Sequence, residues 1–181
     1  MMQSLSLPVL ILLHVLGYGA VLIVIGGPVI WSAGVFAVLL IWISVIDADR
    51  FEIPDMGAGL LALSGLLFLW GQDMAVVIDH ILGGLIWPLL FWAIAYGYLR
   101  ARGFHGLGFG DVKLMCGIGL WCGFFATTNV VLAASLGGIV ILGLRALTKR
   151  SLPRGLNQSM VAFGPFLCLS AWTIWLAGAH L

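Results

Sequence analysis

The sequence predicts an all-α membrane protein, a polytopic bundle of about seven transmembrane helices. Hydrophobic residues make up 62% of the 181 residues, charged residues make up only 8%, and the mean hydropathy is +1.18. Soluble domains carry about 25% charged residues, so this composition is typical of an integral membrane protein. The apolar runs, moreover, approach the length of a membrane span and are separated by glycine, proline and charged residues. We therefore expect a single integral-membrane domain, residues 1–181, with no room for a separate soluble domain.

The first apolar run has the position of a signal peptide but not its features. It follows "MMQSLS", which has no Lys or Arg, and it ends in "VIGGP", which has no A-x-A-like cleavage site, so we expect a retained helix. Two later runs are short for a span of about 20 residues, and short helices suit a tilted or bent segment at the rim of a site. The predicted spans are 5–25, 28–46, 55–71, 76–99, 112–126, 128–146 and 160–179.

The basic residues predict the orientation of these spans. With seven spans, all eight Lys and Arg residues lie in or beside segments 47–54, 100–111 and 147–159, on the side that also holds the N-terminus. Because basic loops face the cytoplasm, we expect a cytoplasmic N-terminus. Removing one span would scatter the basic residues over both sides, so the span count and the orientation support each other.

Several classes of function find no support in the composition. No basic stripe is present, so nucleic acid is not an expected partner. Cys116, Cys122 and Cys168 lie in apolar runs without CxxC spacing, so we expect small buried side chains rather than a zinc site or a disulfide framework. HExxH is also absent, and we predict neither a metal nor a cofactor.

Two acidic segments fall on the predicted cytoplasmic side. "ISVIDADRFEIPD", residues 43–55, places Asp47 at the end of the second span, and "GFHGLGFGDVKL", residues 103–114, places Asp111 at the start of the fifth. A carboxyl group at the edge of an apolar helix is partly desolvated, and a second carboxyl nearby further favours the protonated form of one of the two. One carboxylate can then take a proton from water while the other, protonated, polarises a carbonyl. Asp47 and Asp111 are therefore the predicted catalytic pair for hydrolysing a peptide bond without a covalent intermediate.

The other acids of the first segment need a separate interpretation. Asp47 and Asp49 are two residues apart, so on a continuing helix they would point to opposite faces. We expect Asp47 to face Asp111, and Asp49 and Glu52 to form a solvated face with Arg50. Asp55 suits the first turn of the third helix, at the positive end of its dipole, and is also a candidate active-site residue.

Glycines surround the second acid, at positions 103, 106, 108 and 110. Glycine lets a substrate backbone approach closely, so Gly108 and Gly110 are candidate residues of a substrate-binding loop. The alternative is an ordinary connector in which Asp111 caps a helix. Lys113 either contacts the substrate or tunes the acidic pair, or it extends to lipid headgroups.

Three segments resemble those of the type IV prepilin leader peptidases, the membrane aspartic proteases of the GxGD kind. "IDADRFEIPD" resembles the family's aspartate segment ending in Ile/Leu-Pro-Asp, and "GLGFGDVKL" resembles its Gly-x-Gly-Asp-Phe/Val-Lys-Leu segment. "FGPFLCLSAW", residues 163–172, resembles its Phe-Gly-Pro-Phe/Tyr-Leu segment. The three occur in the family's order, and the resemblance covers about residues 30–179, which leaves the helix at about 5–25 as an addition.

The resemblance implies an aspartic endopeptidase of the bacterial inner membrane whose catalytic pair falls on Asp47 and Asp111. Its substrates would be prepilins or pseudopilins, which carry a short basic leader, then Gly, then a hydrophobic helix, and cleavage would follow the Gly on the cytoplasmic side. Larger members carry a CxxC-containing domain ahead of the core and also N-methylate the new terminus. The sequence contains neither feature, so we expect peptidase activity only, as in short members that serve Tad/Flp-type pili or in dedicated peptidases of other systems.

The residues also allow three other functions. A membrane serine protease could use Ser64 with His80 or His14 as its base. A Mg²⁺-dependent phosphotransferase could use Asp47, Asp49 and Asp111 as ligands. A proton-coupled transporter could use the same carboxyls, although transporters place such sites near the midplane.

Two further patterns concern glycine and tryptophan. Gly119 and Gly123 have the GxxxG spacing that lets helices pack closely. Four tryptophans are expected in the aromatic belt at the outer membrane surface: Trp31, Trp70, Trp172 and Trp175.

Overall fold

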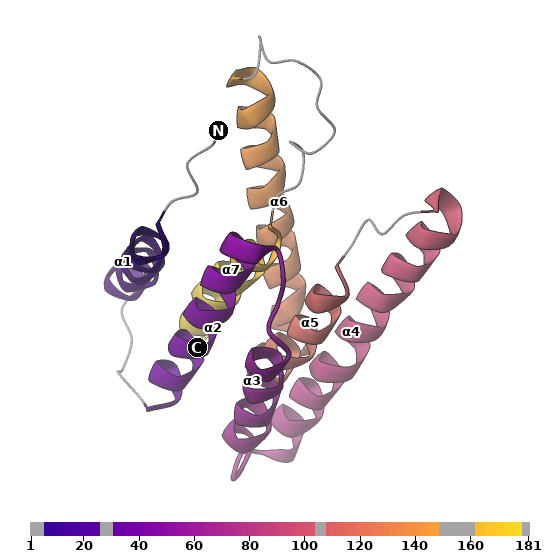
Figure 1. Cartoon of the computed structure of the whole chain (residues 1–181). Coiled ribbons are helices and arrows are strands. Elements are labelled where there is room, and N and C mark those ends of the chain that lie inside the picture. Colours follow the sequence, from indigo (N-terminus) through magenta and orange to yellow (C-terminus); the bar gives the residue numbers. More distant parts are fainter. Residues whose placement is uncertain (1–5, 26–30, 104–107, 149–161, 179–181) are drawn as a thin grey trace.

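The computed structural model describes residues 6–25, 31–103, 108–148 and 162–178. Within these ranges the chain consists of helices and contains no strand, so the predicted all-α class is confirmed (Figure 1). The helices are α1 (Leu7–Ile25), α2 (Trp31–Arg50), α3 (Asp55–Phe68), α4 (Met74–Arg102), α5 (Phe109–Cys122), α6 (Phe124–Thr148) and α7 (Gly164–Gly178).

Helix length divides the bundle into two groups. Among the described residues, α2, α4 and α6 are long and apolar enough to cross a membrane, whereas α1, α3 and α7 are shorter apolar helices. The third and fifth helices have 14 residues each, or about 21 Å at a rise of about 1.5 Å per residue, less than the hydrocarbon core of about 30 Å. The short third and fifth helices expected from the sequence are thus present.

The boundary between the fifth and sixth helices differs from the prediction. The sequence placed residues up to 126 in the fifth span, but α5 ends at Cys122 and α6 begins at Phe124. Gly123 separates them with a φ of +83°, a conformation that glycine adopts without a steric penalty. The apolar residues after Gly123 concealed this break, because composition alone does not show a change of helix direction.

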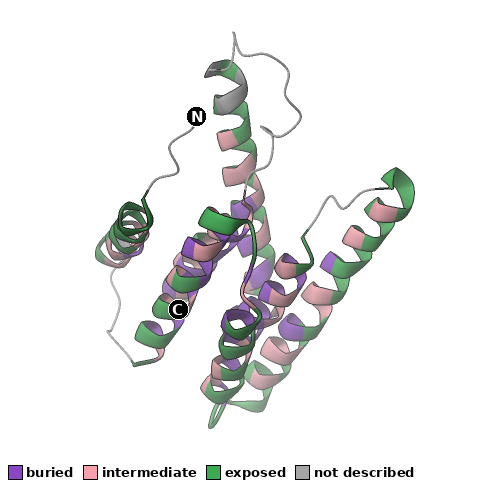
Figure 2. Cartoon of the chain, viewed as in Figure 1, coloured by how far each residue is buried: buried purple, intermediate pink, exposed green. Residues whose placement is uncertain are grey.

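The short helix α5 lies in the centre of the bundle. Ten of its residues are buried, from Asp111 to Cys122, and Figure 2 shows exposed residues along α1 and the outer sides of the bundle instead. Gly119 lies against the backbone of Gly83 in α4, and Gly117 lies against Leu61 in α3. Glycine at these positions lets α5 approach both neighbours closely, so the packing role expected for Gly119 is confirmed.

The two ends of the bundle are named here by what they contain. The aspartate end is where α2 ends and α3, α5 and α7 begin; the opposite end is where α3 and α5 end and α4 and α6 begin. Figure 1 shows α4 continuing well past the start of α5 at the aspartate end. The start of α5 is consequently set back from the end of its longer neighbour.

Of the four tryptophans predicted for the aromatic belt, two are exposed and the other two pack inward, against the prediction. Trp31 and Trp70 are 93% and 90% exposed. Trp172 is buried, however, and Trp175 packs with it and with Phe36 inside the bundle at centroid distances of 6.0 and 5.5 Å. Both faces of a membrane helix are apolar, and the sequence therefore could not show which face of α7 points inward.

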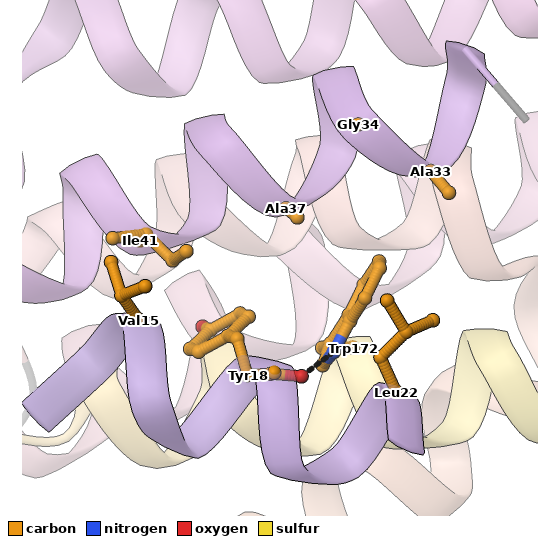
Figure 3. A pocket seen from close by; sticks show the side chains of 9 residues that line it. Val15, Tyr18, Leu22, Ala33, Gly34, Ala37, Ile41 and Trp172 are labelled. Atoms are coloured by element: carbon orange, nitrogen blue, oxygen red, sulfur yellow. Dashed lines mark hydrogen bonds between the residues drawn. The ribbon is translucent and has the colours of Figure 1, made fainter. Parts of the chain in front are cut away.

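Helix α1 packs against the bundle through α2 and α7. The indole N–H of Trp172 donates to the backbone oxygen of Tyr18 at 3.1 Å, and the two rings stack (Figure 3). An apolar cavity of about 190 Å³ lies between these helices. Its lining includes Val15 and Leu22 of α1 and Ile41 of α2.

Candidate active site

The two predicted catalytic acids lie together in the structure. Asp47 is in the last turn of α2, Asp111 is in the first turn of α5, and the residues are only 6% and 8% exposed. Their carboxyl groups are close enough for direct charge–charge interaction. Two buried carboxyl groups within electrostatic reach of each other repel when both are ionised, so the arrangement favours the protonated form of one of them.

Asp111 is held by the start of its own helix. The backbone N–H of Gly108 donates to the Asp111 carboxyl, and the backbone N–H of Asp111 donates to Gly108 O at 3.1 Å. Gly108 is the residue that precedes the first turn of α5, and the Asp111 side chain reaches back to its N–H as the acid of a capping box does, although Gly108 has no side chain to complete the box. Asp111 therefore also has the capping function that the sequence offered as an alternative to a reactive one.

Asp47 is held by a different helix. Its Oδ2 accepts a buried hydrogen bond of 3.0 Å from the backbone N–H of Gly164, the first residue of α7. Gly164 was not among the predicted site residues, although it lies in segment 163–172. The available signal was a Gly-Pro pair opening an apolar helix that has no Ser, Thr, Asp or Asn immediately before it.

Two further polar side chains lie beside the pair. Cys168 of α7 is fully buried and within electrostatic reach of both carboxylates. Ser44, one turn before Asp47 in α2, is buried, and its hydroxyl has no hydrogen-bond partner among the described residues. The interior around the two acids therefore contains more polar groups than the acids alone.

The candidate loop residues lie at the rim of the acidic pair. Lys113 Nζ contacts Asp55 Oδ1 at 2.6 Å, and both side chains are accessible from outside. This ion pair joins the first turn of α5 to the first turn of α3, a contact that the sequence analysis did not predict. Gly110 packs against Ile53, just before α3, where a Cβ atom would lie 3.0 Å from the isoleucine Cβ. His105 and Gly106 lie outside the described residues.

The remaining acids of the first segment face away from the pair. Asp49 and Glu52 are exposed, and Asp49 lies 3.8 Å from Arg50, as expected for a solvated face. Phe51, between them, has a φ of +57°, which is unusual for an aromatic residue and ends α2 sharply.

The residues required for a serine protease or a Mg²⁺-dependent phosphotransferase do not meet. Ser64 bonds to Leu61 O at 3.0 Å, whereas His80 bonds to Leu120 O at 2.8 Å. His14 bonds to Leu10 O of its own helix. Within the described ranges, no group of three or more His, Cys, Asp or Glu side chains is arranged to hold a metal ion. Asp49 points outward, so it does not join the other two aspartates in a ligand set.

The chain is similar to a known family of membrane peptidases. The type IV leader peptidase family matches residues 34–143, which include both buried aspartates. A prepilin leader peptidase/N-methyltransferase of Pectobacterium carotovorum subsp. carotovorum is 32% identical over 143 residues, 79% of this chain and 50% of the relative. Proteins of the same name from Burkholderia pseudomallei and Pseudomonas aeruginosa are 34% and 31% identical, over 78% and 83% of this chain and 44% and 52% of theirs.

The matches cover most of this chain but only part of each relative. The chain spans about half the length of the curated relatives it matches, and no solved structure matches it. The family match covers more than half of the chain and runs from α2 into α6. The chain therefore belongs to the type IV leader peptidase family.

Proposed function

We propose that the chain is an intramembrane aspartic endopeptidase that removes the leader of type IV prepilins or pseudopilins. The observation that carries the proposal is the meeting of two buried carboxyls, Asp47 and Asp111, from separate segments of the chain. The relatives are named prepilin leader peptidases, and this supports the choice of substrate class. The proposal covers the peptidase part of those names only.

The chemistry follows from one proton shared by the pair. The ionised carboxylate removes a proton from a water molecule, which attacks the scissile carbonyl carbon. The protonated carboxyl donates its proton to the carbonyl oxygen, and a tetrahedral diol forms. The carboxyl that took the proton from water then protonates the amide nitrogen as the C–N bond breaks, while the other carboxylate removes a proton from a diol hydroxyl. This releases a new carboxyl terminus and a new amino terminus and restores the single proton of the pair. Low exposure of both aspartates strengthens these interactions, because little solvent screens them.

The location of the site fits a substrate with a polar leader followed by an apolar helix. The acids lie at the helix ends of the bundle, not midway along them. Such a site would meet the junction between leader and helix near a membrane surface, and a midplane transport site would lie deeper. From the distribution of basic residues we assign this end to the cytoplasmic face of the bacterial inner membrane, with cleavage after the leader Gly.

The rim residues would guide the substrate to the acids. Gly108 and Gly110 border Asp111, and their lack of side chains lets the Asp111 carboxylate and Ile53 pack against the backbone of this loop. The exposed Lys113–Asp55 pair joins α5 to α3 beside the loop. We propose that it holds the two helix starts in register while the substrate binds.

A cleavage assay with neutral isosteres tests the proposal. Asp47→Asn and Asp111→Asn keep the size of the side chains and remove the proton chemistry. Each should lower the rate at which membranes containing the protein cleave a prepilin by at least about a hundredfold. Asp79→Asn is the matched control, because Asp79 is a half-buried acid in a long helix at the opposite end.

The outcomes separate the candidate functions. Normal processing by folded Asp47→Asn or Asp111→Asn would exclude the aspartic mechanism. Equal loss of activity in Asp79→Asn would indicate a general effect of removing charge from the bundle.

A further inference from the structure

We propose that Gly164 is a positioning residue that fixes the carboxylate of Asp47. Its backbone N–H holds one carboxylate oxygen, and its missing side chain provides the space in which that carboxylate lies. The consequence for catalysis rests on the proposed function, but the contact itself does not.

The start of α7 leaves one backbone donor for an outside acceptor. Pro165 has no N–H, and the N–H groups of Phe166 and Leu167 both donate to Phe163 O, at 3.1 and 3.2 Å. The N–H of Gly164 points instead to Asp47 Oδ2, 117 residues away in the sequence. Asp47 therefore serves as the N-terminal cap that α7 lacks in its own sequence, and the positive end of the α7 dipole lies beside a carboxylate.

The lack of a side chain at Gly164 matters as much as its hydrogen bond to Asp47. A Cβ atom built there would lie 2.6 Å from Oδ2, 3.0 Å from Cγ and 3.3 Å from Cβ of Asp47. All three atoms belong to one buried side chain, so an alanine could be accommodated only by moving the carboxylate or the helix. A glycine in this position lets the acid and the helix end come into contact.

The second acid uses a looser version of the same contact. Asp111 also accepts from the N–H of a glycine at a helix start, Gly108. A Cβ atom at Gly108 would lie 3.3 Å from Asp111 Oδ2, a distance that a small shift can relieve. The two contacts differ in origin, because Gly108 belongs to the same helix as its acid, whereas Gly164 brings a third helix to the pair.

A double-mutant cycle tests the contact without relying on catalysis. We would measure the melting temperatures of the full chain in detergent for the parent, Gly164→Ala, Asp47→Ala and the double variant. Gly164→Ala should lower the melting temperature clearly in the parent. In the Asp47→Ala background the same change should cost little, because the side chain that it meets is gone. Gly178→Ala, at the far end of the same helix with no atom within 4 Å of its Cβ, is the control.

Kinetics test the positioning role. In the cleavage assay, Gly164→Ala should lower kcat at least about tenfold with little change in KM, because a displaced acid impairs the chemical step rather than substrate binding. Gly178→Ala should leave both constants unchanged.

Each possible result of these measurements either supports or contradicts the contact between Gly164 and Asp47. If Gly164→Ala does not fold, the double variant should recover a folded protein, and its failure to do so would overturn the contact. An equal loss of melting temperature in both backgrounds would also overturn it, as would a Gly164→Ala protein with unchanged kcat. If no variant or parent cleaves a prepilin, the proposed function fails, and the thermal cycle still decides the contact.

Discussion

Both ends of the bundle place an aspartate carboxylate against a glycine: Asp47 against Gly164 at the aspartate end, and Asp79 against Gly123 at the opposite end. Asp79 is only half-buried, and its neighbour His80 bonds to Leu120 O in the last turn of α5. Asp47 is buried and has a second buried carboxyl, Asp111, beside it. Both acids thus lie against a glycine at a helix end, and the feature that distinguishes the proposed catalytic end is the second buried carboxyl.

The two ends also differ in how their polar groups are satisfied. At the opposite end, a histidine donor meets a carbonyl that α5 leaves unpaired, and this lowers the free energy of the folded state. At the aspartate end, one backbone N–H per carboxylate offsets only part of the unfavourable proximity of two acids. Sites that retain such unfavourable contacts are commonly functional.

The largest effect on stability is expected at Gly123. Gly123→Ala combines a positive φ of +83° with a Cβ atom that meets the Asp79 carboxylate. With a ψ of 168°, this backbone conformation is essentially restricted to glycine and should alone cost about 1–3 kcal/mol in the free energy of unfolding, so the melting temperature should fall while folded protein keeps its kcat. Gly138→Ala in α6, with no atom within 4 Å of its Cβ, should leave the melting temperature unchanged. A selective loss of kcat in folded Gly123→Ala would break the division between a structural and a catalytic end.

A smaller effect is expected at His80. His80→Phe keeps an aromatic ring beside Phe68 but removes the donor to Leu120 O, which should cost about 1 kcal/mol in the free energy of unfolding. His80→Gln retains a donor and should lose less. Cleavage measured per folded molecule should be the same in both variants. Loss of cleavage in stable His80→Phe would instead favour a mechanism with a histidine base.

The smallest effect is expected at Asp49, two residues from the buried acid. Asp49 is exposed, and its only described ion pair is a 3.8 Å contact with Arg50. Asp49→Asn should therefore change the free energy of unfolding by less than about 0.5 kcal/mol and keep most of the cleavage activity. A folded but inactive Asp49→Asn protein would mean that the wrong acid of this segment was assigned to the pair.

Several features of the fold were predictable because they depend on local composition. Apolar runs separated by charges and glycines predicted an all-α membrane protein, and the short third and fifth helices were expected from the lengths of their runs. Small buried side chains were expected for all three cysteines; Cys122 and Cys168 are buried, whereas Cys116 is only partly buried. The exposed face containing Asp49 followed from the angle between residues two apart on a helix.

Other features depended on which helix faces meet. Lipid and protein interior are both apolar, so a run such as that of α7 does not reveal that Trp172 and Trp175 point inward. The Lys113–Asp55 pair joins residues 58 positions apart. The end of α5 depended on a single glycine within a continuous apolar stretch.

The sequence by itself determined that two acids would lie at the ends of apolar helices, because charged residues in such a chain are few and their positions are plain. Only the tertiary structure decided that the acids meet, and that the backbone of Gly164 holds one of them. The physical reason is that a backbone N–H carries no signature in the sequence. Its partner is fixed by the packing of α7 against α2, which brings distant segments within hydrogen-bonding distance.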